Sequence, residues 1–291
     1  MSCTMGNAAQ VMKTVSLSSG HTLNLLQKRT GHSAMQLPNN GPGGTVWPAG
    51  EALVQWLAAQ RTGTHASLVP EVASATIGSV LELGTGTGVV SIALALLGAS
   101  SVIATDGDPP SCELCRTNAA ASGVPDLVVT PFVWGSAQHL DDALGSNDGR
   151  CPNWIICADV VYSNESSAAL ELSLRALLAR GGCALVVIGW VARGHHEEAF
   201  LSRLTDLGSV STVERISDAR FGYLTMTRRG GQLVHGAAVE FGITMLRVRA
   251  EVTAGLDPCL RQWCGLMRAR AAVATCRDVL PCWRREAARA V

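Results

Sequence analysis

The segment at residues 80–90, VLELGTGTGVV, constrains the fold of this chain more than any other stretch. An apolar run there passes an acid, Glu82, and enters a turn in which every second residue is glycine, from Gly84 to Gly88. An apolar segment at 89–97 follows. Glycine permits positive φ angles and a close approach to the backbone, and a helix start leaves N–H groups unpaired. The pattern therefore predicts a buried strand, a tight turn and a helix that together face a bound molecule.

An acid at the end of the next expected strand supports a nucleoside as that molecule. The strand covers 101–105 and ends at Asp106, 22 residues after Gly84. This offset is close to that at which an acid binds ribose hydroxyls in nucleoside-binding βαβ units. The alternative is that Asp106 caps the helix expected at 110–122, although Asp108 is better placed to do so. The glycines follow G-x-G-x-G and not the dinucleotide spacing G-x-G-x-x-G, which disfavours an NAD enzyme.

Strand and helix patterns alternate along the middle of the chain. Buried strands are expected at 80–83, 101–105, 127–132, 154–158 and 183–189, and helices at 89–97, 110–122, 166–179 and 195–207. This alternation predicts an α/β fold with a mostly parallel twisted sheet and helices on both faces. Two partly alternating apolar stretches, 210–216 and 242–250, predict an antiparallel C-terminal hairpin that closes the edge of the sheet.

The flanks are expected to be less regular than this α/β domain, which we place at 45–250. Residues 1–44 form an N-terminal extension, partly flexible, with one short strand at 21–27; they contain no acid, as in some organellar transit peptides. Residues 251–291 carry an amphipathic stripe and predict a helical tail, docked on the domain or on a partner. Residues 139–151 are expected to be a polar loop.

Composition excludes several classes of protein. The formal net charge is zero, which argues against nucleic acid or an anionic membrane as a partner. No apolar run reaches the roughly 18 residues of a membrane span. Ten scattered cysteines suit a reducing compartment, so we expect a cytoplasmic protein, and we favour a monomer. Cys112 and Cys115 form a C-x-x-C without a second pair, and packing explains them better than zinc; we expect no metal.

Four motifs follow one another in an order that resembles a known family. They are TVWPAGEAL at 45–53, LELGTGTG at 81–88, TDGD at 105–108 and ADVVY at 158–162. The set resembles methyltransferase family 16, the class I, seven-β-strand enzymes that include many protein-lysine methyltransferases. The resemblance implies a Rossmann-like fold, S-adenosyl-L-methionine as cofactor and a protein substrate.

The resemblance also implies roles for particular residues. It places the cofactor against Trp47, Glu82, Gly84, Thr85, Gly86, Asp106, Trp134 and Ala158, and the target nitrogen beside Asp159 and Tyr162 of a D-x-x-Y motif. Besides Asp106, four of these residues have a purely structural alternative. Trp47 can fix the chain entry to a helix that starts at Pro48, and Trp134 can plug the end of the sheet. Asp159 can serve a turn or a helix N-cap, and Tyr162 can be a packed ring.

The predicted reaction is in-line transfer of a methyl group from a sulfonium to the neutral amine of a lysine. We expect Asp159 to orient the amine and Tyr162 to wall the channel, while burial lowers the pKa of the amine. Two alternatives stay open on the sequence alone. One is a small-molecule N-methyltransferase, and the other is a binding module that keeps the fold without catalysis.

Overall fold

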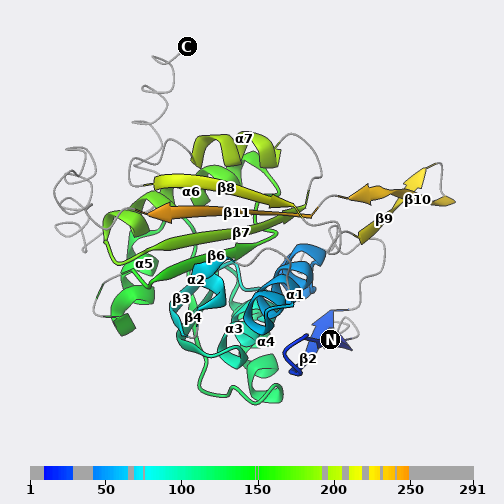
Figure 1. Cartoon of the computed structure of the whole chain (residues 1–291), viewed down its shortest axis with the longest axis horizontal. Coiled ribbons are helices and arrows are strands. Elements are labelled where there is room, and N and C mark those ends of the chain that lie inside the picture. The colour runs from blue at the N-terminus through cyan, green and yellow to red at the C-terminus, as the bar shows by residue number, and fades with distance from the viewer. Residues whose placement is uncertain are drawn as a thin grey trace, which may run out of the picture. The chain divides into compact units, whose positions relative to one another are not determined.

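A computed structural model describes most of the chain before residue 249 (Figure 1). The described residues are 10–28, 42–64, 69–74, 76–147, 149, 151–191, 196–204, 210–217, 223–229, 232–239 and 241–248. The expected helical tail at 251–291 lies outside them, and the domain limits stay a prediction. No helix in the described part combines the length and the apolar character that a membrane crossing needs.

Eleven strands are seen in the described residues. They are β1 (Gln10–Ser16), β2 (Thr22–Lys28), β3 (Ile77–Leu83), β4 (Ala99–Asp106), β5 (Val128–Pro131), β6 (Trp154–Ala158), β7 (Leu185–Val191), β8 (Val210–Ser217), β9 (Tyr223–Arg229), β10 (Gln232–Val239) and β11 (Phe241–Val248). The helices between them are α1 (Pro48–Thr62), α2 (Pro70–Ala73), α3 (Val89–Leu96), α4 (Pro109–Ala121), α5 (Ala137–Leu144), α6 (Asn164–Ala179) and α7 (His196–Arg203), with short 3-10 turns η1 (Pro42–Gly44) and η2 (Gly145–Asn147).

Seven strands form the central sheet, in the order β5-β4-β3-β6-β7-β11-β8. The first five run parallel, and β11 pairs antiparallel with both β7 and β8. The chain steps outward from β3 to β4 and β5, then returns to the other side of β3 with β6. Ligands of open α/β sheets bind at such a switch point, at the carboxyl ends of the strands. The topology therefore places a ligand site at the ends of β3 and β6.

Both faces of the central strands are buried. On one face, Val80, Ile156 and Val187 belong to a core that also contains side chains of α1 and α3. The residues that alternate with them, such as Leu81 and Ile155, are buried as well, on the opposite face. Figure 1 shows α1 on one side of the sheet and α6 on the other. Continuous apolar strands are typical of a sheet covered by helices on both sides, as the sequence predicted.

Local signals explain where the helices begin and end. Pro48 occupies the first turn of α1, and Gly63 in the left-handed conformation ends it. The carboxylate of Asp108 accepts the N–H of Ser111 and caps α4. Ser136 and Ser163 cap α5 and α6 in the same way. Asp108 was the expected cap of α4, and this prediction is confirmed.

Two expectations about individual segments were wrong, and a third was confirmed but incomplete. The stretch 139–151 is not wholly a loop, because α5 and η2 cover much of it; Leu140, Ala143 and Leu144 are buried at helical spacing, a signal hidden by the polar residues between them. The N-terminal extension contains two paired strands, β1 and β2, and not one. The predicted antiparallel pair at the sheet edge exists as β8 and β11, but a separate hairpin of β9 and β10 interrupts it.

The buried sheet gives a matched test of this architecture. Val80 on β3 is fully buried, whereas Val128 on the edge strand β5 is 44% exposed. Val80→Ala should reduce the free energy of unfolding by about 2–3 kcal/mol, because it removes two buried carbons and leaves a cavity. Val128→Ala should cost a small fraction of that amount. Chemical denaturation of the two variants measures both values, and equal losses would contradict the sheet order.

Candidate functional site

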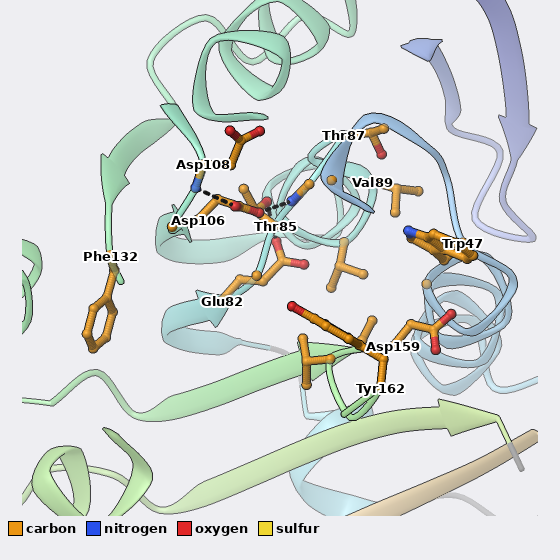
Figure 2. Close-up of a pocket in the computed structure, with 18 of the residues that line it drawn as sticks. Trp47, Glu82, Thr85, Thr87, Val89, Asp106, Asp108, Phe132, Asp159 and Tyr162 are labelled. Carbon is orange, nitrogen blue, oxygen red and sulfur yellow. Dashed lines mark hydrogen bonds between the residues drawn. The ribbon is translucent and has the colours of Figure 1, made fainter. Parts of the chain in front are cut away.

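A cavity of about 370 Å³ lies at the predicted switch point (Figure 2). All ten residues proposed from the sequence line it: Trp47, Glu82, Gly84, Thr85, Gly86, Asp106, Trp134, Ala158, Asp159 and Tyr162. They come from the entry to α1 and from the ends of β3, β4, β5 and β6. The structure thus brings together residues that are more than a hundred positions apart in the chain.

The glycine turn after β3 has the conformation that its sequence predicted. Gly84, Gly86 and Gly88 all have positive φ, at 78°, 52° and 87°. A Cβ on Gly84 would lie 2.9 Å from Val160, and a Cβ on Gly86 would lie 3.0 Å from the carbonyl oxygen of Gly43. Side chains at these positions would be strained and would crowd the cavity wall.

Glu82 stabilises the glycine turn through hydrogen bonds from Thr85 in the turn and from Ser91 in α3. Its Oε2 accepts hydrogen bonds from the hydroxyl of Thr85 at 2.7 Å, from the N–H of Ser91 at 3.0 Å and from the hydroxyl of Ser91. The side chain is 1% exposed. Burial raises the pKa of Glu82 to about 7, against the hydrogen bonds that lower it. Glu82 is therefore a structural brace of the turn and a titratable group of the cavity.

Asp106 faces the cavity from the end of β4, and Figure 2 shows its two hydrogen bonds. Its carboxylate oxygens accept the N–H of Gly86 at 2.9 Å and the N–H of Asp108 at 2.9 Å. Burial raises the pKa of Asp106 above its ordinary value. Since Asp108 caps α4, Asp106 does not have the capping role weighed for it. Its carboxylate is placed to accept hydrogen bonds from a hydroxylated ligand.

Aromatic side chains form part of the cavity wall. Trp47 takes the N-cap position of α1 without a side-chain cap bond and lines the cavity. Trp134 packs against Gly84, its ring 3.2 Å from where a Cβ would stand. Its indole Nε1 is buried and has no hydrogen-bond partner among the described residues. A buried donor of this kind commonly finds its partner in a ligand or in water.

Asp159 and Tyr162 follow β6 at the opposite side of the cavity from Asp108 in Figure 2. Asp159 has a φ of 59°, rare outside glycine, and its N–H donates to the carbonyl of Gly189 at 3.0 Å. The N-cap of α6 is Ser163, so Asp159 is not a helix cap. Tyr162 is 48% exposed and hence is not a packed core ring. Partial burial raises the pKa of its hydroxyl.

Several lining residues were not proposed from the sequence. Gly43 and Thr45 belong to the segment 42–47 before α1, in which Gly43 packs directly on Gly86 of the glycine turn. A Cβ on Gly43 would clash with the hydroxyl of Ser111, which explains why this position needs glycine. Phe132, 1% exposed, lines the cavity beside Trp134. The run of glycines at 43–44 was the available signal for a close backbone contact.

The two cysteines of the C-x-x-C are packed in the protein interior. Cys112 and Cys115 are buried in α4 as free thiols. Burial raises the pKa of Cys115 to about 12, so its thiol is protonated at neutral pH. The part of the chain that the structure describes contains no cluster of three or more ligating side chains able to hold a metal ion.

Comparisons with known proteins show which family the chain is similar to. The sequence model of a family described as lysine methyltransferase, methyltransferase family 16, matches residues 30–207, more than half of the chain. The protein N-lysine methyltransferase METTL21A of Danio rerio is 34% identical over 139 residues, 46% of this chain and 59% of the relative. The ribosomal protein L11 methyltransferase of Myxococcus xanthus is 39% identical over 98 residues, 31% of this chain and 33% of the relative.

Two further matches concern the fold and the share of each relative that this chain covers. The protein N-terminal and lysine N-methyltransferase efm7 of Emericella nidulans is 34% identical over 119 residues, 38% of this chain and 46% of the relative. The chain thus spans less than two thirds of each of these curated relatives. A crystal structure of a SAM-dependent methyltransferase from Agrobacterium tumefaciens matches with a TM-score of 0.51 at 12% identity, over 84% of this chain and 72% of that one. At this identity the likeness concerns the fold.

The raised pKa of Glu82 predicts a pH dependence of stability. Folding moves this pKa from its ordinary 4.5 to about 7, so the folded state holds a proton that the unfolded state releases. The contribution of Glu82 is fully present below pH 4.5 and is lost as the pH rises through 7. Relative to Glu82→Gln, the wild-type free energy of unfolding should fall by on the order of 3 kcal/mol across this window.

Urea denaturation of both proteins from pH 4.5 to 8 measures this difference. Glutamine keeps an acceptor oxygen for Thr85 and Ser91, and the other titrating carboxylates are common to both proteins. The difference between the two curves therefore isolates Glu82. Curves that run parallel over the whole range would show that burial leaves this carboxyl at its ordinary pKa.

Proposed function

The chain belongs to methyltransferase family 16, the lysine methyltransferases, and from that premise we propose that it methylates the side-chain amine of a lysine in a protein substrate. Its cofactor is S-adenosylmethionine. The observation that carries the proposal is the placement of Asp159 and Tyr162 on the wall of the cavity that the glycine turn and Asp106 also line. A cofactor site and a candidate amine site thus share one cavity.

The residues of the cavity fit this cofactor. The volume of about 370 Å³ suits a small ligand. Gly84 and Gly86 line the cavity with backbone alone, because a side chain at either position would clash with Val160 or Gly43, and Asp106 is oriented to accept the ribose hydroxyls. In this proposal Trp134, whose buried indole N–H has no partner among the described residues, neighbours the adenine, and Trp47, at the N-cap of α1, lines the same cavity. When bound there, the cofactor supplies a methyl group on a positively charged sulfonium.

The charge of the cavity also favours a cationic ligand. Four acids line it, Glu82, Asp106, Asp108 and Asp159, and the described lining contains no lysine or arginine. Carboxylates attract both the sulfonium and an incoming ammonium group, and they add no charge that would repel either. A lysine must lose its proton before it can attack, since its ordinary pKa is about 10.4. Burial of the amine and the positive charge of the sulfonium lower that pKa, whereas the nearby carboxylates raise it.

Asp159 and Tyr162 have distinct roles in this proposal. The carboxylate of Asp159 accepts a hydrogen bond from the lysine amine and aims its lone pair at the methyl group. The ring of Tyr162, half exposed beside it, forms a wall for the aliphatic part of the lysine. The protein contributes mainly alignment, which supplies about 7–11 kcal/mol at best when reactants are held as a near-attack pair.

Asp159→Asn gives a sharp test of this role. Asparagine has the same size and tolerates the left-handed φ of 59°, whereas alanine at this position would also strain the backbone. The variant should lose about a hundredfold or more in kcat, because a misdirected amine no longer reaches the methyl group. Its Kd for S-adenosylmethionine should stay within about threefold of wild type. Radiometric methyl transfer and calorimetry measure the two quantities.

Asp126→Asn is the matched control. Asp126 is exposed, lies in the turn after α4 and does not line the cavity. Its variant should have wild-type turnover. Unchanged kcat in Asp159→Asn would refute the proposed role, whereas failure of the wild-type chain to bind S-adenosylmethionine would refute the cofactor site itself and favour a binding module.

The substrate class is tested by labelling a lysate. Purified chain is incubated with cell extract and S-adenosylmethionine that carries a radioactive methyl group, with Asp159→Asn as the background. Label should enter discrete protein bands, and mass spectrometry should locate it on lysine side chains. Label confined to small solutes would support a small-molecule N-methyltransferase instead. The proposal of a protein substrate would then fall, while the cofactor site would stand.

A further inference from the structure

One buried amide joins three segments of the chain that are distant in sequence. Asn118 lies in α4 and is fully buried. Its Oδ1 accepts the N–H of Leu26 at 2.7 Å, and its Nδ2 donates to the carbonyl of Leu26 at 3.0 Å. The same Nδ2 donates to the carbonyl of Thr87 at 2.8 Å. Both N–H groups and the carbonyl oxygen of the side chain are therefore in use.

The bond to Thr87 reaches the glycine turn itself. Thr87 lines the cavity and is 2% exposed. It precedes the N-cap Gly88, so its carbonyl lies outside the hydrogen-bond ladder of α3. The N–H of Ser91, four residues later, donates to Glu82. Asn118 thus supplies a donor to a buried carbonyl that its own helix does not satisfy, and a buried carbonyl without a donor is costly.

The other end of this connection is the N-terminal hairpin of β1 and β2. The Asn118 amide binds both backbone groups of Leu26, as a neighbouring strand would do. The hairpin is also held elsewhere, since Leu23 and Leu25 are buried in the core and Gln55 donates to the carbonyl of Ser16 at 2.8 Å. These contacts hold the hairpin against the core, and the hydrogen bonds of Asn118 connect the glycine turn to the hairpin.

We propose that Asn118 is a positioning residue for the cofactor: it holds the Thr87 carbonyl against the β1–β2 hairpin and so keeps the glycine turn in the form that accepts S-adenosylmethionine. The hairpin then belongs to the cofactor-binding structure, although it contributes no residue to the cavity wall. This inference rests on the cofactor position proposed above. It is independent of the lysine specificity, and of whether Asp159 acts in transfer.

The test compares two variants of Asn118 with matched controls. Asn118→Ala removes all three bonds, and Asn118→Asp keeps the acceptor for Leu26 but turns a carboxylate oxygen toward Thr87. The Kd for S-adenosylmethionine, measured by calorimetry on folded protein, should rise by about tenfold in each. Thr117→Ala, at the exposed neighbouring position of α4, and Asn24→Ala, on the exposed side of β2, should stay within about twofold of wild type.

Hydrogen exchange separates positioning from a merely structural role. In the Asn118 variants, amides of the segment 84–88 should lose protection without the cofactor, while amides of β6 and β7 should keep it. If Asn118→Ala does not fold, Asn118→Asp carries both measurements. Wild-type affinity and wild-type exchange of the turn in a folded Asn118 variant would overturn the inference. If the wild-type chain does not bind S-adenosylmethionine, the proposed function fails first.

Discussion

The connection between the glycine turn and the end of β4 is the constraint on which the rest of the site depends. The carbonyl of Thr105 accepts the N–H groups of both Gly84 and Thr85, at 2.9 and 2.8 Å, and the hydroxyl of Thr105 donates to the carbonyl of Glu82. These bonds fix the turn to the neighbouring strand without a contribution from the side chains that line the cavity. Because Asp106 directly follows Thr105, the same connection sets the spacing between the turn and the acid.

Much of this arrangement could be predicted from the sequence, because its signals are local. Positive φ at Gly84 and Gly86 follows from the glycine spacing, and the position of Asp106 follows from the length of one βα unit. The cap at Asp108 required only the residue type and the helix that it precedes. The motif resemblance added Trp47 and Asp159, whose convergence on one cavity depends on the order of strands in the sheet and on no local pattern.

The parts that were missed depend on contacts between distant segments. Strand β1 has few buried positions of its own, and it is ordered by its pairing with β2 and by contacts of the pair with α1 and α4. Helix α5 is short, and its apolar residues cover only one stripe. In the sequence, no pattern distinguishes Asn118 from the other residues of its helix. Its hydrogen-bond partners, Leu26 and Thr87, are 92 and 31 positions away, so no local pattern indicates them.

The cavity is lined by acids whose pKa values are raised by burial. Glu82 has a pKa of about 7 because burial outweighs its hydrogen bonds, and the carboxylate of Asp106 raises it further. A cation placed among these acids favours their ionised forms and lowers both pKa values. The binding of a sulfonium should therefore favour the ionised form of Glu82 near neutral pH. The same burial that makes the ionised Glu82 destabilising at high pH strengthens its interaction with a positively charged ligand, since a buried charge is little screened by water. Glu82, which hydrogen-bonds to the glycine turn, and Asp106, at the end of β4, are thus electrostatically coupled.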